Sequence, residues 1–217
     1  MSQRTALDAA LSPFERGSEI IFGILMAISV TAAFEITAGG NVDVRELTIA
    51  ALGCNLAWGL IDGVIYLMQQ QFERHRSHGR ILALRSAASE DGFRTQVRDA
   101  VPPAIGQALT PESFARIREA VQAYSAPRPR LWPAQEFAVA GIICLLAFGS
   151  TFPLVVPFLV MQDAWLALRV SHAVAVVMLF VLGWRLGRWS GISPLGSGFV
   201  LAGMGSVLAV ACVALGG

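Results

Sequence analysis

The chain has 217 residues, of which 55% are hydrophobic and only 14% are charged. Soluble domains carry roughly 25% charged residues, so this composition excludes an ordinary water-soluble globular protein and indicates an integral membrane protein. The formal net charge is only +1, but all 16 basic residues are arginines, and their positions can therefore be used to orient the chain in a membrane.

Five stretches are apolar enough to cross a hydrocarbon core about 30 Å thick, which takes about 20 helical residues. We predict an all-α integral membrane protein with five transmembrane helices. The predicted spans are residues 18–40, 46–70, 134–159, 164–187 and 194–216. Before the first span, Ser12, Pro13 and Glu15 have the spacing of a helix-capping box, so this helix should begin before the membrane does. In the third span, Pro153 and Pro157 should kink or break the helix near its outer end.

The segment between the second and third spans is the only sizeable polar part of the sequence. It contains three stretches with apolar residues at helical spacing, and the last of them starts at Thr110, a predicted N-cap. We therefore divide the chain into residues 1–70 with the first two spans, a helical insert at 71–133, and residues 134–217 with the last three spans.

The arginines set the predicted orientation. With five spans, most of them, including the whole group in the insert, fall on the same side of the membrane as the N-terminus, and the opposite loops hold only Arg45. Because positively charged loops stay in the cytoplasm, we expect the N-terminus and the insert there and the C-terminus outside it. Such spans suit a bacterial inner membrane. The arginines should contact anionic lipid headgroups, and no nucleic-acid-binding motif accompanies them.

Asp62 is the most informative polar residue, because it lies within the apolar second span. An ionised carboxylate costs several kcal/mol in hydrocarbon unless it faces protein or water. Asn55, Asp62 and Gln69 recur every seven residues and form a polar stripe along one face of the helix. Gly59 and Gly63 flank Asp62 and allow another backbone to come close. Two interpretations stay open: a hydrogen bond across a helix interface, or a place on an ion or ligand pathway.

Further acidic residues lie at the start of the first span. By the same helical geometry, Glu15, Glu19 and Met26 fall on one face. In the predicted orientation Glu19 lies at the cytoplasmic mouth and Asp62 about two turns in from the same side, so we expect both carboxylates to face one cavity and bind a cation. A carboxylate and thioether combination would suit ferrous iron or manganese better than an alkali ion, although Met26 also fits a simple packing role.

Farther out, Glu35 and Arg169 are expected at matched depth near the outer ends of their spans, with His172 one turn deeper on the Arg169 face. Glu35 and Arg169 form either a neutralising ion pair or, together with His172, a group that takes part in coupled proton movement. No pattern typical of a catalytic nucleophile or a phosphate-binding loop occurs, so we predict that the chain is not an enzyme.

This layout resembles the vacuolar iron transporter family. The resemblance is carried by the five spans, the helical insert, the acidic start of the first span ("FERGSE") and the glycine-rich last span after a proline ("ISPLGSGFVLAGMGSVLAVACVALGG"). It implies export of ferrous iron or manganese from the cytoplasm in exchange for protons, without a permanently bound cofactor. The paired glutamates of the family would fall on Glu15 and Glu19. The aspartate that the family carries deeper in that span would align near Met26, and the Asp-Gly pair occurs instead in the second span as Asp62 and Gly63.

The resemblance also implies a homodimer with the ion path between the first spans of two subunits. Gly23 and Ala27 would allow two first spans to approach closely, and a similar small-residue face on the last span serves either a dimer or packing within the subunit. We therefore predict a metal-transporting homodimer with Glu19 and Asp62 as metal ligands. The alternatives are a non-transporting scaffold or sensor whose arginine-rich insert binds lipid or a partner protein, and a membrane-embedded enzyme.

Overall fold

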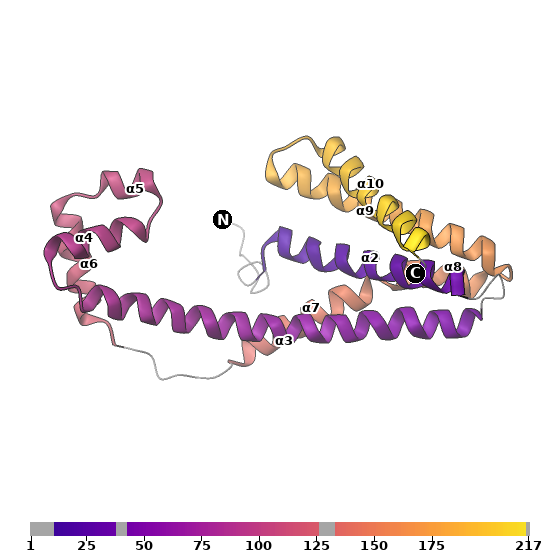
Figure 1. Ribbon diagram of the computed structural model, residues 1–217, viewed down its shortest axis with the longest axis horizontal. Coiled ribbons are helices and arrows are strands. Elements are labelled where there is room, and N and C mark those ends of the chain that lie inside the picture. The colour runs from indigo at the N-terminus through magenta and orange to yellow at the C-terminus, as the bar shows by residue number, and fades with distance from the viewer. Residues whose placement is uncertain (1–10, 38–42, 126–132, 216–217) are drawn as a thin grey trace, which may run out of the picture. The chain divides into compact units, whose positions relative to one another are not determined.

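The computed structural model describes residues 11–37, 43–125 and 133–215, and every regular element in these ranges is a helix (Figure 1). The chain divides into two compact units. The first, which we call the membrane unit, comprises Met1–Tyr66 and Ala134–Gly217, and the second, the insert, comprises Leu67–Pro133. The helices are Pro13–Thr37 (α2), Val44–Arg85 (α3), Glu90–Asp99 (α4), Pro103–Ala108 (α5), Pro111–Ala123 (α6), Ala134–Gly149 (α7), Phe152–Val160 (α8), Ala164–Ser190 (α9) and Pro194–Leu215 (α10).

Five segments of the described chain are long and apolar enough to cross a membrane, which confirms the predicted all-α integral membrane protein. These segments are Pro13–Ala33, Val44–Arg85, Ala134–Val160, Ala164–Ser190 and Pro194–Ala211. The second helix continues to Arg85, well beyond the end predicted for its span. No proline interrupts it after the apolar stretch, and a single interior glycine, Gly79, costs only about 1 kcal/mol of helix stability.

The third span consists of two helices, as its prolines indicated. α7 ends at Gly149 and α8 begins at Phe152, so the break lies at Ser150 and Thr151. Pro153 occupies the first turn of α8, where its missing N–H leaves no hydrogen bond unmade. The Thr151 hydroxyl does not cap α8 and is therefore free for other partners.

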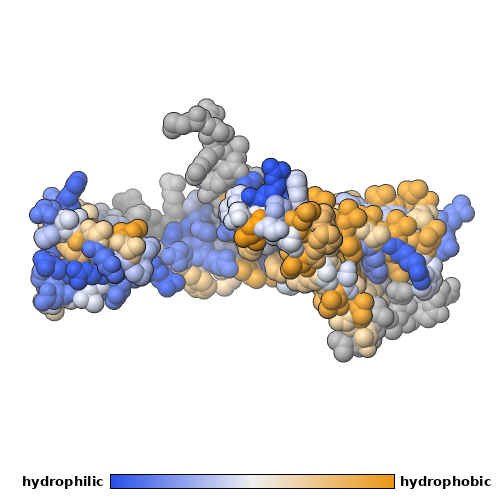
Figure 2. Space-filling model, turned by 90° about the horizontal axis from the view of Figure 1, so that it is seen from above, coloured by the Kyte–Doolittle hydropathy of each residue, from blue (hydrophilic) through white to orange (hydrophobic). Residues whose placement is uncertain are grey.

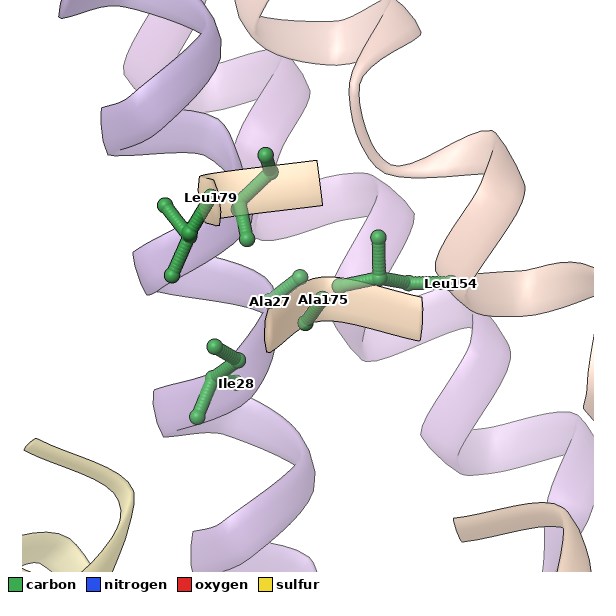
Figure 3. Close-up of a cluster of buried hydrophobic side chains, with 6 residues drawn as sticks. Ala27, Ile28, Leu154, Ala175 and Leu179 are labelled. Carbon is green, nitrogen blue, oxygen red and sulfur yellow. The ribbon is translucent and has the colours of Figure 1, made fainter. Parts of the chain in front are cut away.

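The core of the membrane unit joins α2, α8 and α9. Ala27 and Ala175 are almost completely buried, and their small side chains let α2 and α9 approach closely. Larger side chains fill the space around them (Figure 3). The buried cluster is Ile24, Ala27, Ile28, Leu154, Ala175 and Leu179.

Glycines allow α9 and α10 to pack closely against each other. Gly191, with φ 74°, ends α9 in the left-handed conformation that glycine adopts without strain. A Cβ added to Gly183 would lie 2.5 Å from the carbonyl oxygen of Ser197, and one added to Gly198 would lie 2.8 Å from the Phe180 ring. The small-residue face of the last span therefore serves packing within the chain.

The insert has a core of its own. Phe93 and Val97 of α4 pack against Phe114 of α6, and all three are buried. Thr110 caps α6, as predicted, by accepting a hydrogen bond from the Ser113 N–H. The backbone N–H of Glu112 and the Thr110 hydroxyl hold the pKa of the exposed Glu112 carboxyl below its ordinary value.

The two units differ in surface character. Apolar side chains dominate the visible surface of the membrane unit, and hydrophilic side chains dominate that of the insert (Figure 2). On α3, Leu60 is 57% exposed and Val64 is 56% exposed, as expected for side chains that face lipid or another membrane helix.

Candidate functional site

The structure brings Glu19 of α2 and Asp62 of α3 together. Their carboxyl groups lie within hydrogen-bonding reach of each other, and both side chains are half-buried. Oε2 of Glu19 is enclosed and has no hydrogen-bond partner among the residues that the structure describes. Two carboxylates this close repel each other unless a proton or a cation lies between them. We call Glu19 and Asp62 the acidic pair.

Close packing of α7 fixes the part of α3 that carries Asp62. A Cβ added to Gly59 would lie 2.9 Å from Cα of Cys144, and one added to Gly63 would lie 3.0 Å from the carbonyl oxygen of Ala140. The two glycines therefore do what their spacing predicted, and the backbone that they admit is that of α7.

Trp58, one turn before Asp62, adds a donor to the site. Its indole N–H is buried without a hydrogen bond of normal geometry, yet it lies close enough to interact with the Asp62 carboxyl. Sequence reasoning missed this residue because a tryptophan in an apolar run reads as another apolar side chain. Its spacing of four residues from Asp62 was the available signal.

Glu15 serves mainly as a helix cap. Ser12 N–H donates to Glu15 Oε2 at 2.6 Å, and Glu15 N–H donates to Ser12 Oγ at 3.2 Å, which is the reciprocal capping box that the sequence predicted. The exposed Glu15 carboxylate still lies near enough to Glu19 to act on it electrostatically. Met26 is half-buried and lies about 10 Å along α2 from Glu19, so the structure does not bring its thioether to the acidic pair.

Asn55 lies in a second polar cluster, deeper along α3. It is completely buried, and its Nδ2 donates to the Gly23 carbonyl oxygen at 3.0 Å and to Thr151 Oγ1. Thr151 and Ser150 form the break between α7 and α8, and both are buried. We call Gly23, Asn55, Ser150 and Thr151 the polar junction, because they tie α2, α3 and the broken third span together. The sequence signal for Ser150 and Thr151 was two hydroxyl side chains just before Pro153 in an apolar span.

A third polar contact lies nearer the other end of α2. Nε2 of His172 is 3.0 Å from Thr31 Oγ1. Because the Thr31 hydroxyl donates to main-chain carbonyls of its own helix, it must accept from His172, so Nε2 carries the proton. The Arg169 guanidinium lies 4.1 Å from the ring centroid of Trp165. The side chain of Glu35 lies outside the described residues, so its pairing with Arg169 stays a prediction.

Within residues 11–37, 43–125 and 133–215, the acidic pair offers two carboxylates and no further protein ligand of the usual kinds. Among the residues that the structure describes, no three His, Cys, Asp or Glu side chains come together as a metal site. Gln69, the last member of the predicted stripe, is exposed. A metal held by the acidic pair would fill its remaining coordination positions with ligands such as water or main-chain oxygens.

No protein-family model matches the sequence, and no curated protein matches it at a significant level.

Proposed function

We propose that the chain is a transporter of divalent transition-metal cations, iron or manganese, of the vacuolar iron transporter type. The single observation that supports this is the meeting of the Glu19 and Asp62 carboxyl groups inside the membrane unit. Such a pair costs free energy in a membrane span, and like charges do not hold helices together. A cation bound between the two carboxyl groups removes this cost.

The charge of the pair favours a divalent cation over a monovalent one. Two carboxylates neutralise one Fe²⁺ or Mn²⁺, and carboxylate oxygen is an acceptable donor for both metals. When the cation leaves, a proton between the two carboxyl groups relieves the same repulsion. The pair therefore has the chemistry for exchange of a metal ion against protons.

The partial exposure of the pair favours a homodimer. Glu19 and Asp62 are only half-buried within one chain, and the surface of α3 near them is apolar. Carboxyl groups at such a surface need a cover of protein or water, because lipid tails offer no hydrogen bonds. A second copy over this face would enclose the pair and bring two more carboxylates toward it.

The sequence suggested the Gly23 and Ala27 face of α2 for the dimer, but this face packs against other helices of the same chain. Gly23 packs against Ala147 and Ser150 of the same chain, and Ala27 is 1% exposed in the core. The Gly23 and Ala27 face of α2 is therefore used inside the chain. We propose instead that a dimer uses the exposed face of α3 beside Asp62, where a second copy would cover the acidic pair.

From the positions of the arginines we infer that the membrane is a bacterial inner membrane and that the insert and the N-terminus lie on its cytoplasmic side. Glu19 lies near the N-terminal end of α2, so in this orientation the acidic pair lies toward the cytoplasmic side. A cation would reach it from the cytoplasm and leave toward the other side.

The proposal is tested by metal flux into proteoliposomes loaded with a metal-sensitive dye. Asp62→Asn should abolish Fe²⁺- or Mn²⁺-dependent flux, and Glu19→Gln should lower it, because each removes one of the two charges. Glu46→Gln, which neutralises an exposed carboxylate in the first turn of the same helix, is the matched control and should transport normally. Normal flux in a folded Asp62→Asn variant would end the transport proposal.

The second candidate function is a membrane scaffold or sensor that acts through the insert. It is favoured by the order of the arginines there: the Arg118 guanidinium lies 4.2 Å from the Phe93 ring centroid and 2.7 Å from Glu90. Arg94 and Arg98 lie over Phe114. Guanidinium groups held on buried rings present ordered charge to an anionic lipid or partner. This function predicts no metal flux in any variant.

A further inference from the structure

The polar junction is a cluster of buried polar side chains inside the membrane unit, and we expect it to hold a bound water or ion. Asn55 and Thr151 are 0% exposed and Ser150 is 6% exposed, although all three are polar and lie in the membrane unit. They meet where α7 stops and α8 starts, so main-chain groups of a helix end are also present there. Broken helices in membranes are tolerated where other groups satisfy the freed backbone.

One oxygen of the junction has no hydrogen-bond partner in the described part of the chain. The amide of Asn55 is oriented by the Gly23 carbonyl oxygen, which can only accept a hydrogen bond, so Nδ2 must face it. This leaves Oδ1 buried without any hydrogen-bond donor. A buried acceptor left in this state is costly, and a bound water or cation is the usual remedy.

The donor set at the junction selects the kind of occupant. The oxygens are the Asn55 amide, the Ser150 and Thr151 hydroxyls and the carbonyl of Ala147, which accepts from Ser150 Oγ at 2.7 Å. All are uncharged and hard, so they suit a small monovalent cation, which would leave half as much uncompensated charge in this buried place as a divalent cation. The C-terminal end of α7, with its partial negative charge, lies at the same point.

We propose that the polar junction is a sodium-ion site, separate from the acidic pair. Along α2, Gly23 lies about 6 Å from Glu19, and along α3, Asn55 lies about 10 Å from Asp62. Both steps lead away from the N-terminal end of α2, so the two sites lie in series on the same pair of helices. The sodium site does not depend on the proposed function; only its role as a coupling ion for the transported metal rests on that function.

Salt-specific thermal unfolding of the purified full-length protein tests the site. The measurement uses chelator-treated protein in NaCl, KCl or choline chloride at equal ionic strength. We expect NaCl to raise the unfolding midpoint by about 2–4 °C over choline chloride. Equal midpoints in the three salts would overturn the proposal and leave water as the occupant.

Two variants test whether the sodium-dependent shift of the unfolding midpoint arises at the polar junction. Thr151→Val keeps the shape and removes the hydroxyl, so the sodium shift should vanish. Ser171→Ala is the matched control, because Ser171 is an equally buried hydroxyl that donates to the Leu154 carbonyl oxygen elsewhere in the unit, and it should keep the shift. A sodium shift that survives Thr151→Val would reject the site.

Two further measurements keep the proposal independent of folding and of transport. Saturable binding of radioactive sodium to the wild-type protein needs no variant, and its absence would overturn the proposal even if Thr151→Val fails to fold. Asp62→Asn should retain the sodium shift. Loss of the shift in Asp62→Asn would assign sodium to the acidic pair instead, whereas failure of the metal-transport proposal would appear only in the flux assay.

Discussion

Gly23 of α2 and Ser150, which directly follows α7, lie so close together that no side chain fits between them. A Cβ added to Gly23 would come within 2.5 Å of the Ala147 carbonyl oxygen and still closer to the Ser150 hydroxyl. We expect Gly23→Ala to lower the free energy of unfolding by about 1–3 kcal/mol, because the crowding involves main chain that cannot rotate away. Thermal unfolding in detergent measures the change.

The control for this change lies on α7. No atom of the described residues lies within 4 Å of a Cβ added to Gly141, so Gly141→Ala should be neutral or stabilise the helix by about 0.5–1 kcal/mol. Adding Ser150→Ala to Gly23→Ala should restore only part of the loss, since the Ala147 carbonyl stays. A fully stable Gly23→Ala variant would mean that α2 and α7 are not in the close contact described.

Neutralising one member of the acidic pair should not harm the fold. In Asp62→Asn the amide donates a hydrogen bond to the Glu19 carboxylate and the repulsion is gone. The free energy of unfolding should therefore stay the same or rise by up to about 1 kcal/mol. If Asp62 were there only to bridge two helices, the same variant would lose stability and keep its metal response. Unfolding and flux measured on one preparation separate these outcomes.

Substitution of Glu15 tests whether this residue only caps α2 or also lies on the ion path. Glutamine serves as well as glutamate in a capping box, so Glu15→Gln should keep the start of α2 intact and change metal flux little. Ser12→Ala removes the other half of the cap and should cost about 1 kcal/mol of stability. A flux loss in Glu15→Gln as large as that in Glu19→Gln would place Glu15 on the ion path.

Helical periodicity was enough to predict several contacts. Residue spacing fixes which side chains share a face of a helix, so the meeting of Glu19 and Asp62, the Ser12 and Glu15 cap and the packing role of Gly59 followed from the sequence. Composition and length alone gave the five spans. The cap depends on a single helix and the acidic pair on two helices that are neighbours along the chain, whereas the spacing of Gly59 predicted a close approach without identifying α7 as the partner.

Features that depend on a third helix were not predictable. A small-residue face permits close approach but does not name the partner, so Gly23 was assigned to a dimer although α7 of the same chain fills its face. The partner of Asn55 is Thr151, which follows it only after the whole insert, and no local pattern connects them. The continuation of α3 to Arg85 was not predicted for a different reason: it depends on the absence of helix-breaking residues rather than on a sequence pattern that marks a helix.

The proposed orientation can be checked by labelling with a membrane-impermeant thiol reagent. In a background without Cys54, Cys144 and Cys212, we expect Arg45→Cys to react in intact cells and Glu90→Cys to react only after the membrane is opened. Both positions are exposed in the structure, so accessibility of the side chain itself does not limit either reaction. Reaction of Glu90→Cys in intact cells would put the insert outside the cytoplasm.

The core of the insert gives the last prediction. Phe93 is 1% exposed between α4 and α6, and Phe93→Ala should cost about 3–5 kcal/mol, more than so small a core can lose and stay folded. Ile105→Ala is the control within the same unit, because Ile105 is 53% exposed and its loss should have little effect. Hydrogen exchange of the insert, measured in the full-length protein, reports the difference.

The same two variants bear on which function the chain has. The acidic pair belongs to the membrane unit, so a transporter that uses it should retain metal flux in Phe93→Ala even when the amides of the insert exchange freely. A scaffold or sensor acts through the folded insert and should lose partner or lipid binding in Phe93→Ala and keep it in Ile105→Ala. Flux that disappears together with the fold of the insert would show that the two units are coupled in transport, and the acidic pair alone would then not suffice.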